Sequence, residues 1–353
     1  MDQRILHIAL GMVFSDLDRN SRAERHDDHI SIVAEGDISL TVRVYWPDVF
    51  QRIRDKWHIS LGEIRDELEH GPLVVSELAG EVDSGCLFSA RERMVIKGLP
   101  TDEYAMFRDT FEAVSSYILG QDETLLPHHI AFFRIETSVK LKTKCQYFTV
   151  SRSLFPRQNH EHLFFLDLKG CSTRASSEEG GILKDADVTW EHEMSFTQQE
   201  REDVLRVLKN DVHFLQDLNM TNYSLMVAIT KRYVQTSLQL PGQPYGPDAN
   251  ENESDDRKKT LPIRHDIADG AKAIRADLVP KPRFCDEHPE WEYYFGLIDV
   301  LTPFKTKAKI ARAFRIAMGA SKEDISNMPP PEYGERFINF MESTIFPSYF
   351  EEG

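Results

Sequence analysis

At 353 residues, with 41% hydrophobic and 28% charged residues, the chain has a globular composition and is long enough for two lobes with a sizeable core. No run of eighteen apolar residues is present, which argues against a membrane span, and the net charge of −16 argues against general nucleic-acid binding. Four cysteines without paired spacing argue against a zinc site or a disulfide framework and suit a reducing cytosol.

The N-terminal part is predicted to mix helices and strands. Residues 4–17 fit an amphipathic helix with Ile5, Ile8, Met12 and Val13 on one side, a face open to use as core or as a dimer contact. Residues 38–44 alternate between apolar and polar side chains, which predicts a half-buried strand. Ser60 and Glu63 have the spacing of a capping box and predict the start of a further helix.

The next stretch carries the first candidate site residues. Ser84-Gly85-Cys86 forms a tight turn whose amides could cradle a phosphate, with a plain hairpin as the alternative. Lys97 ends an apolar strand and therefore needs an anion nearby. The helix predicted over residues 101–120 places Glu103 in its first turn. Kinases hold nucleotide phosphates with such a lysine–glutamate pair, although an ordinary salt bridge explains it as well.

The second half is organised around residues 197–229, which read as a helix, a polar turn and a buried strand. Asp211 lies on the apolar stripe of the helix and must find a partner or reach water. The turn puts Asn222 at the mouth of the strand, where catalytic groups are often held, although an ordinary core explains this stretch too. Asp299 stands in the middle of another buried strand and is expected to bind a cation, with a metal ion as the natural candidate.

The order of these motifs resembles the phosphatidylinositol phosphate kinases over roughly residues 40–345. The motifs are, in chain order, Ser84-Gly85, MVIK ending at Lys97, LLP at 125–127, DLKG at 167–170, LKDAD at 183–187, NYSLMVAI at 222–229, GLIDVL at 296–301 and PPPEYGERFINFM at 329–341. The family writes the central ones as an IK strand, DLKGS, LKD, MDYSLLVGI and IIDIL. Each motif alone is weak, and the ordered set carries the resemblance.

The resemblance implies an α+β fold with two kinase-like lobes. The N-terminal lobe, residues 1–152, would contain an antiparallel sheet, and the C-terminal lobe, residues 153–353, would be mixed α/β. Residues 241–259 are polar and rich in proline and glycine, which predicts a disordered insert in the second lobe. One flat face of the fold would lie against a membrane.

The resemblance also implies the roles of the nucleotide-binding residues. Lys97 would hold the ATP phosphates with Glu103 as its partner, and Asp299 would bind Mg²⁺. Ser84 and Gly85 would belong to the glycine-rich loop, which has only one glycine here. Residues 149–154 would be the hinge against which the adenine rests.

The phosphoryl-transfer residues follow the family with two departures. Lys169 would lie near the transferred phosphate or the lipid head group, supported by Asp167. Arg174 would contact phosphate, in a loop about two residues shorter than the family's. Asn222 replaces the family's aspartate, the presumed base for the inositol hydroxyl. An amide can orient a hydroxyl but cannot take its proton, and general base catalysis contributes roughly 10²–10⁴-fold.

Residues 304–318 reverse the local charge in an acidic chain. This segment contains Lys305, Lys307, Lys309, Arg312 and Arg315 and no acid. A basic amphipathic segment suits an anionic bilayer, with a solvated helix edge as the alternative. In the family this is the activation loop, which sets substrate choice, and Ala311 there points to a 5-phosphate substrate.

Together these features predict a cytoplasmic lipid kinase, peripheral at the cytosolic face of membranes. It would use ATP and Mg²⁺ to convert a phosphatidylinositol monophosphate into the 4,5-bisphosphate. The alternative from another class is a phosphoinositide-binding scaffold without turnover, which Asn222 favours. A protein kinase is disfavoured because the chain has no HRD-type loop and no DFG triplet. A homodimer remains open.

Overall fold

The computed structural model describes residues 3–19, 27–35, 38–75, 86–139, 142–154, 160–171, 174–175, 182–188, 198–232, 291–304 and 328–347. The elements of the first lobe are α1 (Gln3–Arg19), β1 (Asp27–Glu35), β2 (Ile38–Tyr45), α2 (Pro47–Lys56), α3 (Leu61–Glu69), β3 (Cys86–Phe88), β4 (Met94–Leu99), α5 (Thr101–Gly120), β5 (His129–Val139) and β6 (Lys142–Arg152). Those of the second are β7 (His160–Leu168), β8 (Ile182–Lys184), a 3-10 turn (Asp185–Asp187), α6 (Gln198–Asp217), β9 (Ser224–Arg232), β10 (Trp291–Ile298), α9 (Pro330–Phe340) and a π-helical turn (Met341–Ile345).

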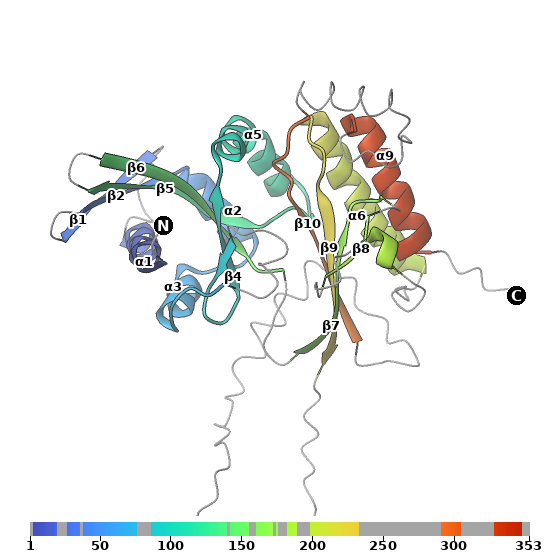
Figure 1. Ribbon diagram of the computed structural model, residues 1–353, viewed down its shortest axis with the longest axis horizontal. Helices are drawn as coiled ribbons and strands as arrows, with labels where there is room; N and C mark the ends of the chain where they lie inside the picture. Colours follow the sequence, from blue (N-terminus) through green and yellow to red (C-terminus); the bar gives the residue numbers. More distant parts are fainter. Residues whose placement is uncertain are drawn as a thin grey trace, which may run out of the picture.

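The first lobe is built on a six-stranded antiparallel sheet in the order β1-β2-β5-β6-β4-β3. Successive side chains of a strand point to opposite faces, so neighbouring phenylalanines of β5 enter different cores. Phe133 packs with residues of α1 and α3, whereas Phe132 packs with residues of α2 and α5. The sheet is therefore covered by helices on both faces (Figure 1).

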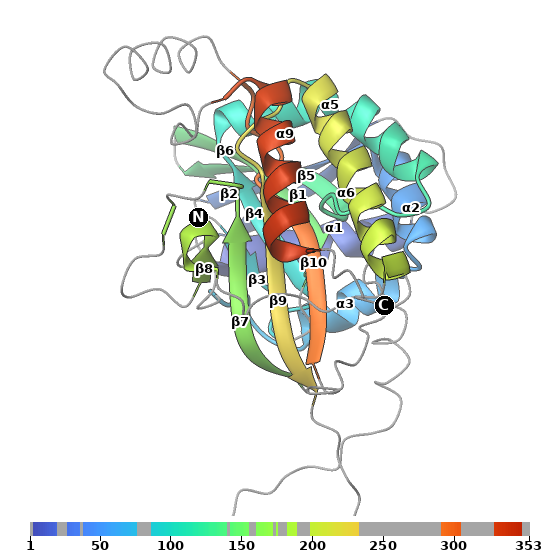
Figure 2. The same cartoon turned by 90° about the vertical axis from the view of Figure 1, so that its right-hand side faces the viewer.

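The second lobe is built on a four-stranded mixed sheet in the order β10-β9-β7-β8, in which only β7 and β8 run parallel. α6 and α9 lie side by side over this sheet (Figures 1 and 2). One buried apolar cluster includes Phe107 and Phe111 of α5 together with Leu208 of α6 and Phe337 of α9. The two lobes therefore share a core, which fixes the sheets relative to each other. The α+β fold expected from the sequence is confirmed.

Most local predictions are confirmed. The capping box between Ser60 and Glu63 is present, and α5 and the strands β2 and β9 lie where the sequence predicts them. α6 covers residues 198–217, although Thr197, the predicted start of its cap, lies outside the described residues. The insert predicted over residues 241–259 also lies outside them. None of the described helices is long and apolar enough to cross a membrane.

The predicted face of the first helix is only partly right, because Val13 is buried and Ile5 and Met12 pack against the core but Ile8 does not. Ile8 is 46% exposed, whereas Leu6, Leu10 and Val13 are fully buried. Residues at positions i, i+4 and i+7 share one helical face, and in α1 the face that starts at Leu6 packs against α3 and β2. Val13 alone of the four predicted core residues is fully buried, so the true stripe is rotated from the predicted one.

Candidate functional site

Lys97 lies on β4 and faces the helix that follows it. Met94 and Ile96 are buried on one face of β4, and alternation turns Lys97 to the other face. Glu103 occupies the first turn of α5, and its Oε2 lies 3.3 Å from Nζ of Lys97. The expected ion pair is present, and its role in binding phosphate stays a prediction.

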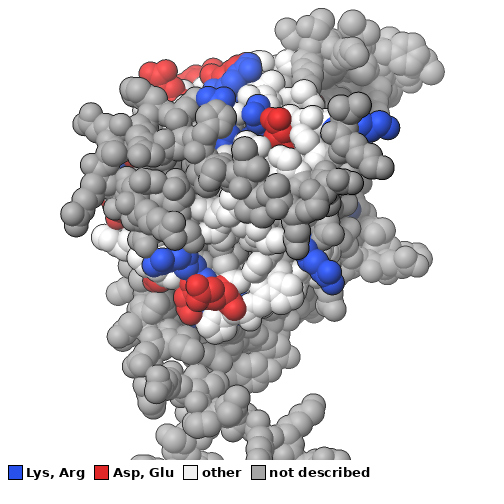
Figure 3. Space-filling view, turned by 90° about the vertical axis from the view of Figure 1, so that its left-hand side faces the viewer, with Lys and Arg blue, Asp and Glu red and all other residues white. Residues whose placement is uncertain are grey.

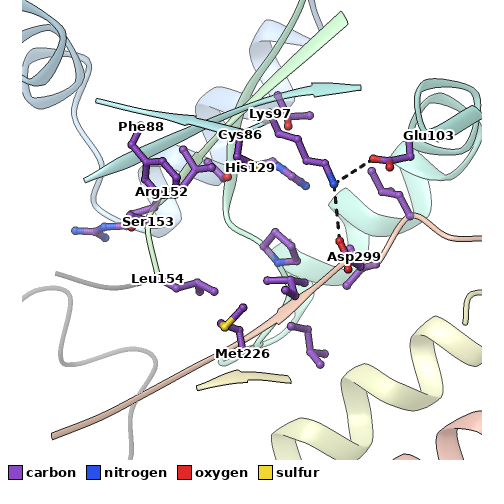
Figure 4. Close-up of a pocket in the computed structure, with 18 of the residues that line it drawn as sticks. Cys86, Phe88, Lys97, Glu103, His129, Arg152, Ser153, Leu154, Met226 and Asp299 are labelled. Carbon is purple, nitrogen blue, oxygen red and sulfur yellow. Dashed lines mark ion pairs between the residues drawn. The ribbon is translucent and has the colours of Figure 1, made fainter. Parts of the chain in front are cut away.

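Asp299 lies on the other side of Lys97. Its Oδ1 is 3.9 Å from Nζ of Lys97, so the lysine lies between two carboxylates (Figure 4). The prediction that Asp299 stands in the middle of a strand is wrong, because β10 ends at Ile298 and Asp299 follows with a φ of 58°. The sequence shows an unbroken apolar run on both sides of this acid, and only the backbone reveals the strand end. The carboxylate is thereby a third exposed, at 33%.

A cleft opens between the two sheets around these charges (Figure 4). Its walls include Thr149, Ser151, Arg152, Ser153 and Leu154, which belong to the predicted hinge at residues 149–154. Ser84 and Gly85 of the predicted glycine-rich loop lie outside the described residues, but the adjacent Cys86 lines the cleft. Most of the cleft wall is apolar, with Val95, Met226 and Leu297 among its members.

His129 also lines this cleft, at the start of β5. Burial, together with the smaller effect of the nearby charge of Lys97, lowers the pKa of its imidazole to about 4. The ring is therefore neutral at physiological pH. It meets the ring of Phe107 edge to face at a centroid distance of 5.4 Å, so it acts as part of the uncharged wall.

Asn222 and Asp299 lie at the same end of the second sheet. β9 begins at Ser224, two residues after Asn222, and Ser224 pairs with Ile298, the last residue of β10. Both residues adopt the left-handed conformation, with φ of 62° and 58°. Asn and Asp adopt this conformation more readily than other residues with a side chain. The predicted position of Asn222 at the mouth of a strand is confirmed.

Lys169 connects these two residues. Its Nζ donates a hydrogen bond to the backbone carbonyl of Asn222 at 2.9 Å and lies 3.6 Å from Oδ2 of Asp299. Asp299 thus receives one lysine from each lobe. Lys97, Lys169, Asp299 and Asn222, which are far apart in the sequence, meet at one end of the cleft.

Asp185 holds the turn that carries Lys169. Its buried Oδ1 accepts three consecutive backbone N–H groups, from Lys169 at 2.8 Å, Gly170 at 2.5 Å and Cys171 at 3.2 Å. Gly170 has a φ of 70°, and a Cβ there would lie 2.9 Å from Cα of Phe337. Only glycine fits both conditions. Sequence reasoning placed Asp185 in a motif but gave it no such role.

Arg174 lies between two carboxylates of the same lobe. It donates to the backbone oxygen of Asp167 at 2.5 Å, to the carboxylate of Asp167, and to Oδ2 of Asp185 at 3.2 Å. These contacts tie the guanidinium to the ends of β7 and β8. The expected phosphate contact of Arg174 stays a prediction, and it would require the guanidinium to serve protein and ligand together.

Helix α9 supports the site from behind. Tyr333 donates its hydroxyl to the backbone oxygen of Tyr223, and Arg336 donates to the backbone oxygen of Lys169 at 3.3 Å. The sequence signal for this role was the motif at residues 329–341, whose tyrosine and arginine had no assigned partner. The predicted membrane and substrate residues Lys305, Lys307, Lys309, Ala311 and Arg312 lie outside the described residues.

Comparison with known proteins agrees with this arrangement. A family model described as phosphatidylinositol-4-phosphate 5-kinase matches residues 72–344. The human phosphatidylinositol 5-phosphate 4-kinase type-2 beta is 25% identical over 329 residues, which cover 85% of this chain and 76% of the relative. The type-2 gamma enzyme of Xenopus tropicalis is 27% identical over 320 residues, covering 84% and 74%. A probable phosphatidylinositol phosphate kinase of Dictyostelium discoideum is 23% identical over 344 residues, covering 85% and 47%. Because the family model spans most of the chain and both lobes of the cleft, the chain belongs to the phosphatidylinositol phosphate kinase family.

Proposed function

We propose that the protein transfers the γ-phosphate of ATP to a phosphatidylinositol monophosphate and so forms phosphatidylinositol 4,5-bisphosphate. The observation that carries this proposal is the position of Lys97 between Glu103 and Asp299 on the wall of the cleft. A lysine fixed by a glutamate and facing a second carboxylate can bind nucleotide phosphates beside a metal ion. The apolar remainder of the wall suits a purine ring.

The donor set around Asp299 fits Mg²⁺. Mg²⁺ is commonly held by one or two carboxylates together with substrate phosphates, and Asp299 offers a partly exposed carboxylate beside the lysine that would bind those phosphates. When bound there, the ion would neutralise charge that develops on the transferred phosphoryl group. Among the described residues, no group of three or more potential metal ligands is found. In the proposed site, nucleotide phosphates and water would supply further ligands.

The second lobe would place the acceptor. Asp185 and Arg336 fix the backbone of Lys169. Its ammonium reaches Asp299, and from there it would contact the transferred phosphate. Asn222 would orient the inositol hydroxyl through its amide. Without a basic oxygen at this position, turnover would rest on positioning and charge stabilisation, which dominate phosphoryl transfer.

We propose the 5-phosphate lipid as the preferred substrate. The activation-loop position Ala311 supports it, and the human and Xenopus relatives are named as 5-phosphate 4-kinases. The test is radiolabelled phosphate transfer from ATP to vesicles that contain each phosphatidylinositol monophosphate in turn. Clear preference for the 4-phosphate lipid would remove the substrate assignment and leave the kinase assignment in place.

Asn222 favours a second candidate, a scaffold that binds phosphoinositide and nucleotide without turnover. Because the amide keeps the shape and the hydrogen bonds of an aspartate, binding would survive while the proton acceptor is lost. Binding of the protein to these vesicles, without labelled product on any of the monophosphates, would establish this second candidate.

We propose that the basic segment at residues 305–315 docks the protein on anionic membranes at the cytosolic face. Exposed charges are screened beyond about 8–10 Å at physiological salt, so vesicle binding should weaken as salt rises. Replacing Lys305, Lys307 and Lys309 by glutamate should release the protein from vesicles. Charge reversal of Lys142 and Lys144, exposed lysines on β6, is the control. In the view of Figure 3, most of the acidic side chains that are described lie beside basic ones.

Two further assignments remain proposals. We place the lobe boundary near residue 152, where β6 ends and the cleft wall continues into residues 153 and 154. A homodimer is the other, and analytical ultracentrifugation would decide it.

A further inference from the structure

Asp211 is a buried carboxylate in the middle of α6 that accepts three hydrogen bonds. Its side chain is 0% exposed. Oδ1 accepts the hydroxyls of Tyr117 and Thr124, each at 2.8 Å, and Oδ2 accepts the backbone N–H of Leu125 at 2.5 Å. No lysine, arginine or histidine in the described part of the chain forms an ion pair with it. Burial of a carboxylate without a cationic partner costs free energy unless hydrogen bonds compensate for it. The three donors therefore determine whether Asp211 is tolerated in the core.

The donors of Asp211 lead to both sides of the nucleotide cleft. Tyr117 lies in the last turn of α5, the helix that carries Glu103 in its first turn. Leu125 lies in the loop after α5, and its carbonyl oxygen accepts the backbone N–H of Leu297 at 2.7 Å. Leu297 is two residues before Asp299 on β10. One carboxylate is therefore connected by hydrogen bonds to α5, whose Glu103 pairs with Lys97, and to β10, the strand that Asp299 follows.

We propose that Asp211 is a positioning residue that sets the distance between the Lys97–Glu103 pair and Asp299. The inference rests on the proposed nucleotide site for its functional meaning. A nucleotide with its metal ion must engage Lys97 and Asp299 at the same time, and these residues come from different lobes. Small errors in such a spacing are costly in sites that depend on fixed geometry. Asp211 touches neither ligand nor reacting atoms and acts only through Tyr117, Thr124 and Leu125.

The chemistry of the three donors defines the variants. Asp211→Leu introduces an apolar side chain of similar size, which suits the buried position, but leaves the N–H of Leu125 without its acceptor. Asp211→Asn is the conservative change, because its amide oxygen can accept from Leu125 while its NH₂ group donates to the two hydroxyl oxygens. Phe214→Leu is the matched control. Phe214 stacks on Tyr117 at 4.0 Å between α6 and α5, so its loss loosens the same contact without touching Asp211.

The first measurement is residue-resolved hydrogen exchange of the whole protein at a temperature where every variant is folded. Asp211→Leu should speed exchange of the Leu125 and Leu297 amides by about tenfold or more, which corresponds to one order of magnitude in the opening equilibrium. In Asp211→Asn and Phe214→Leu, the exchange rates of both amides should stay within about twofold of those in the parent. Unchanged exchange at Leu297 in Asp211→Leu, or equal acceleration in Phe214→Leu, would overturn the proposal.

The second measurement compares ATP affinity with and without Mg²⁺. Asp211→Leu should reduce the gain in affinity that Mg²⁺ confers by about tenfold, because a wrong spacing penalises the ligand that engages both lobes. Phe214→Leu should lower the melting temperature but keep this ratio, and Asp211→Asn should also keep it. Equal ratios in Asp211→Leu and Phe214→Leu would contradict a positioning role. If the parent binds no nucleotide, the proposed function fails, and exchange at Leu297 alone decides the role of Asp211.

Discussion

Charged side chains have different surroundings in the two halves of the cleft. We call Lys97, Glu103 and Asp299 the nucleotide half and Lys169, Arg174 and Asn222 the transfer half, after their proposed roles. In the nucleotide half, the ammonium of Lys97 lies between the carboxylates of Glu103 and Asp299, and all three side chains are 21–33% exposed to the cleft. In the transfer half, Arg174 is engaged by two carboxylates and Lys169 by a carbonyl and a carboxylate, and Asn222 places a neutral amide at the proposed position of the base. Under the proposed function, the first half would bind phosphates and a metal ion, and the second would hold Lys169 in a fixed position. Affinity and turnover should therefore separate under mutation.

The largest expected effect is a gain in the transfer half. Asn222→Asp should raise lipid phosphorylation by more than about tenfold and by up to roughly 10⁴-fold, the upper end of the range for general base catalysis. ATP affinity should stay within about twofold, because aspartate also tolerates the left-handed backbone at this position. Radiolabelled phosphate transfer on vesicles measures the change.

Asn222→Gly is the control for this prediction, since it keeps the backbone conformation and removes the amide. If the parent turns over briskly and Asn222→Asp gains nothing, another group is the base. Asp185 is then a poor candidate, because its oxygens accept three backbone N–H groups and Arg174. Asp187 accepts the backbone N–H of Lys184 at 2.8 Å and would be tested next.

The second effect is a loss in the nucleotide half. Lys97→Ala and Asp299→Ala should each weaken Mg²⁺-ATP binding by about 100-fold or more, since removing one member of a charge pair with the ligand costs about 2–5 kcal/mol. Both side chains are partly exposed, so the fold should persist. Calorimetric titration measures the affinity, with Lys144→Ala on the exposed face of β6 as control. Unchanged affinity in both variants would remove these residues from the nucleotide site.

A smaller expected effect is a loss of turnover without a loss of ATP affinity. Arg174→Lys cannot reproduce the forked contacts to Asp167 and Asp185, so the turn that carries Lys169 should shift. We expect about tenfold lower turnover with ATP affinity within about twofold. Arg108→Lys, on the exposed surface of α5, is the matched control. A parallel loss of ATP affinity would show that the two halves are not separable.

The smallest effect concerns Asp211, which lies behind both halves. Burial raises the pKa of this carboxyl from 3.8 to about 6, although the hydrogen bonds from Leu125, Tyr117 and Thr124 oppose the rise. The folded state therefore binds the proton more tightly, and the stability that this group contributes is present below pH 3.8 and lost as pH rises through 6. The free energy of unfolding of the parent relative to Asp211→Asn should fall by at most about 1.4 kcal/mol per pH unit across this window. Urea unfolding at several pH values measures it, and a flat difference would contradict the raised pKa.

The sequence predicted what depends on neighbours in the chain. The capping box at Ser60, the apolar face of α5 and the buried strand β9 follow from local spacing, and the structure confirms them. The pair of Lys97 and Glu103 was also accessible, since only six positions separate them in the sequence.

Features that depend on contacts between distant parts of the chain could not be predicted in this way. The three donors to Asp211 lie 86–94 positions away from it in the sequence, and no local pattern marks them. β10 ends just before Asp299, whose backbone is left-handed and whose carboxylate meets two lysines from separate lobes. The face of α1 was only partly predicted because several apolar stripes fit its sequence, and packing against α3 selects one of them.

The close approach of Gly170 to α9 has a consequence for how the protein is made. The turn that carries Lys169 receives Arg336 as a neighbour from 167 positions further along the chain, and Phe337 closes against Gly170 at a distance that admits no side chain. Contacts of such long sequence separation form late, because the entropy of closing the loop must be overcome first. A nascent chain can carry every charged residue of the cleft and still lack a finished site. Synthesis of helix α9 is then the step that completes the surroundings of Lys169.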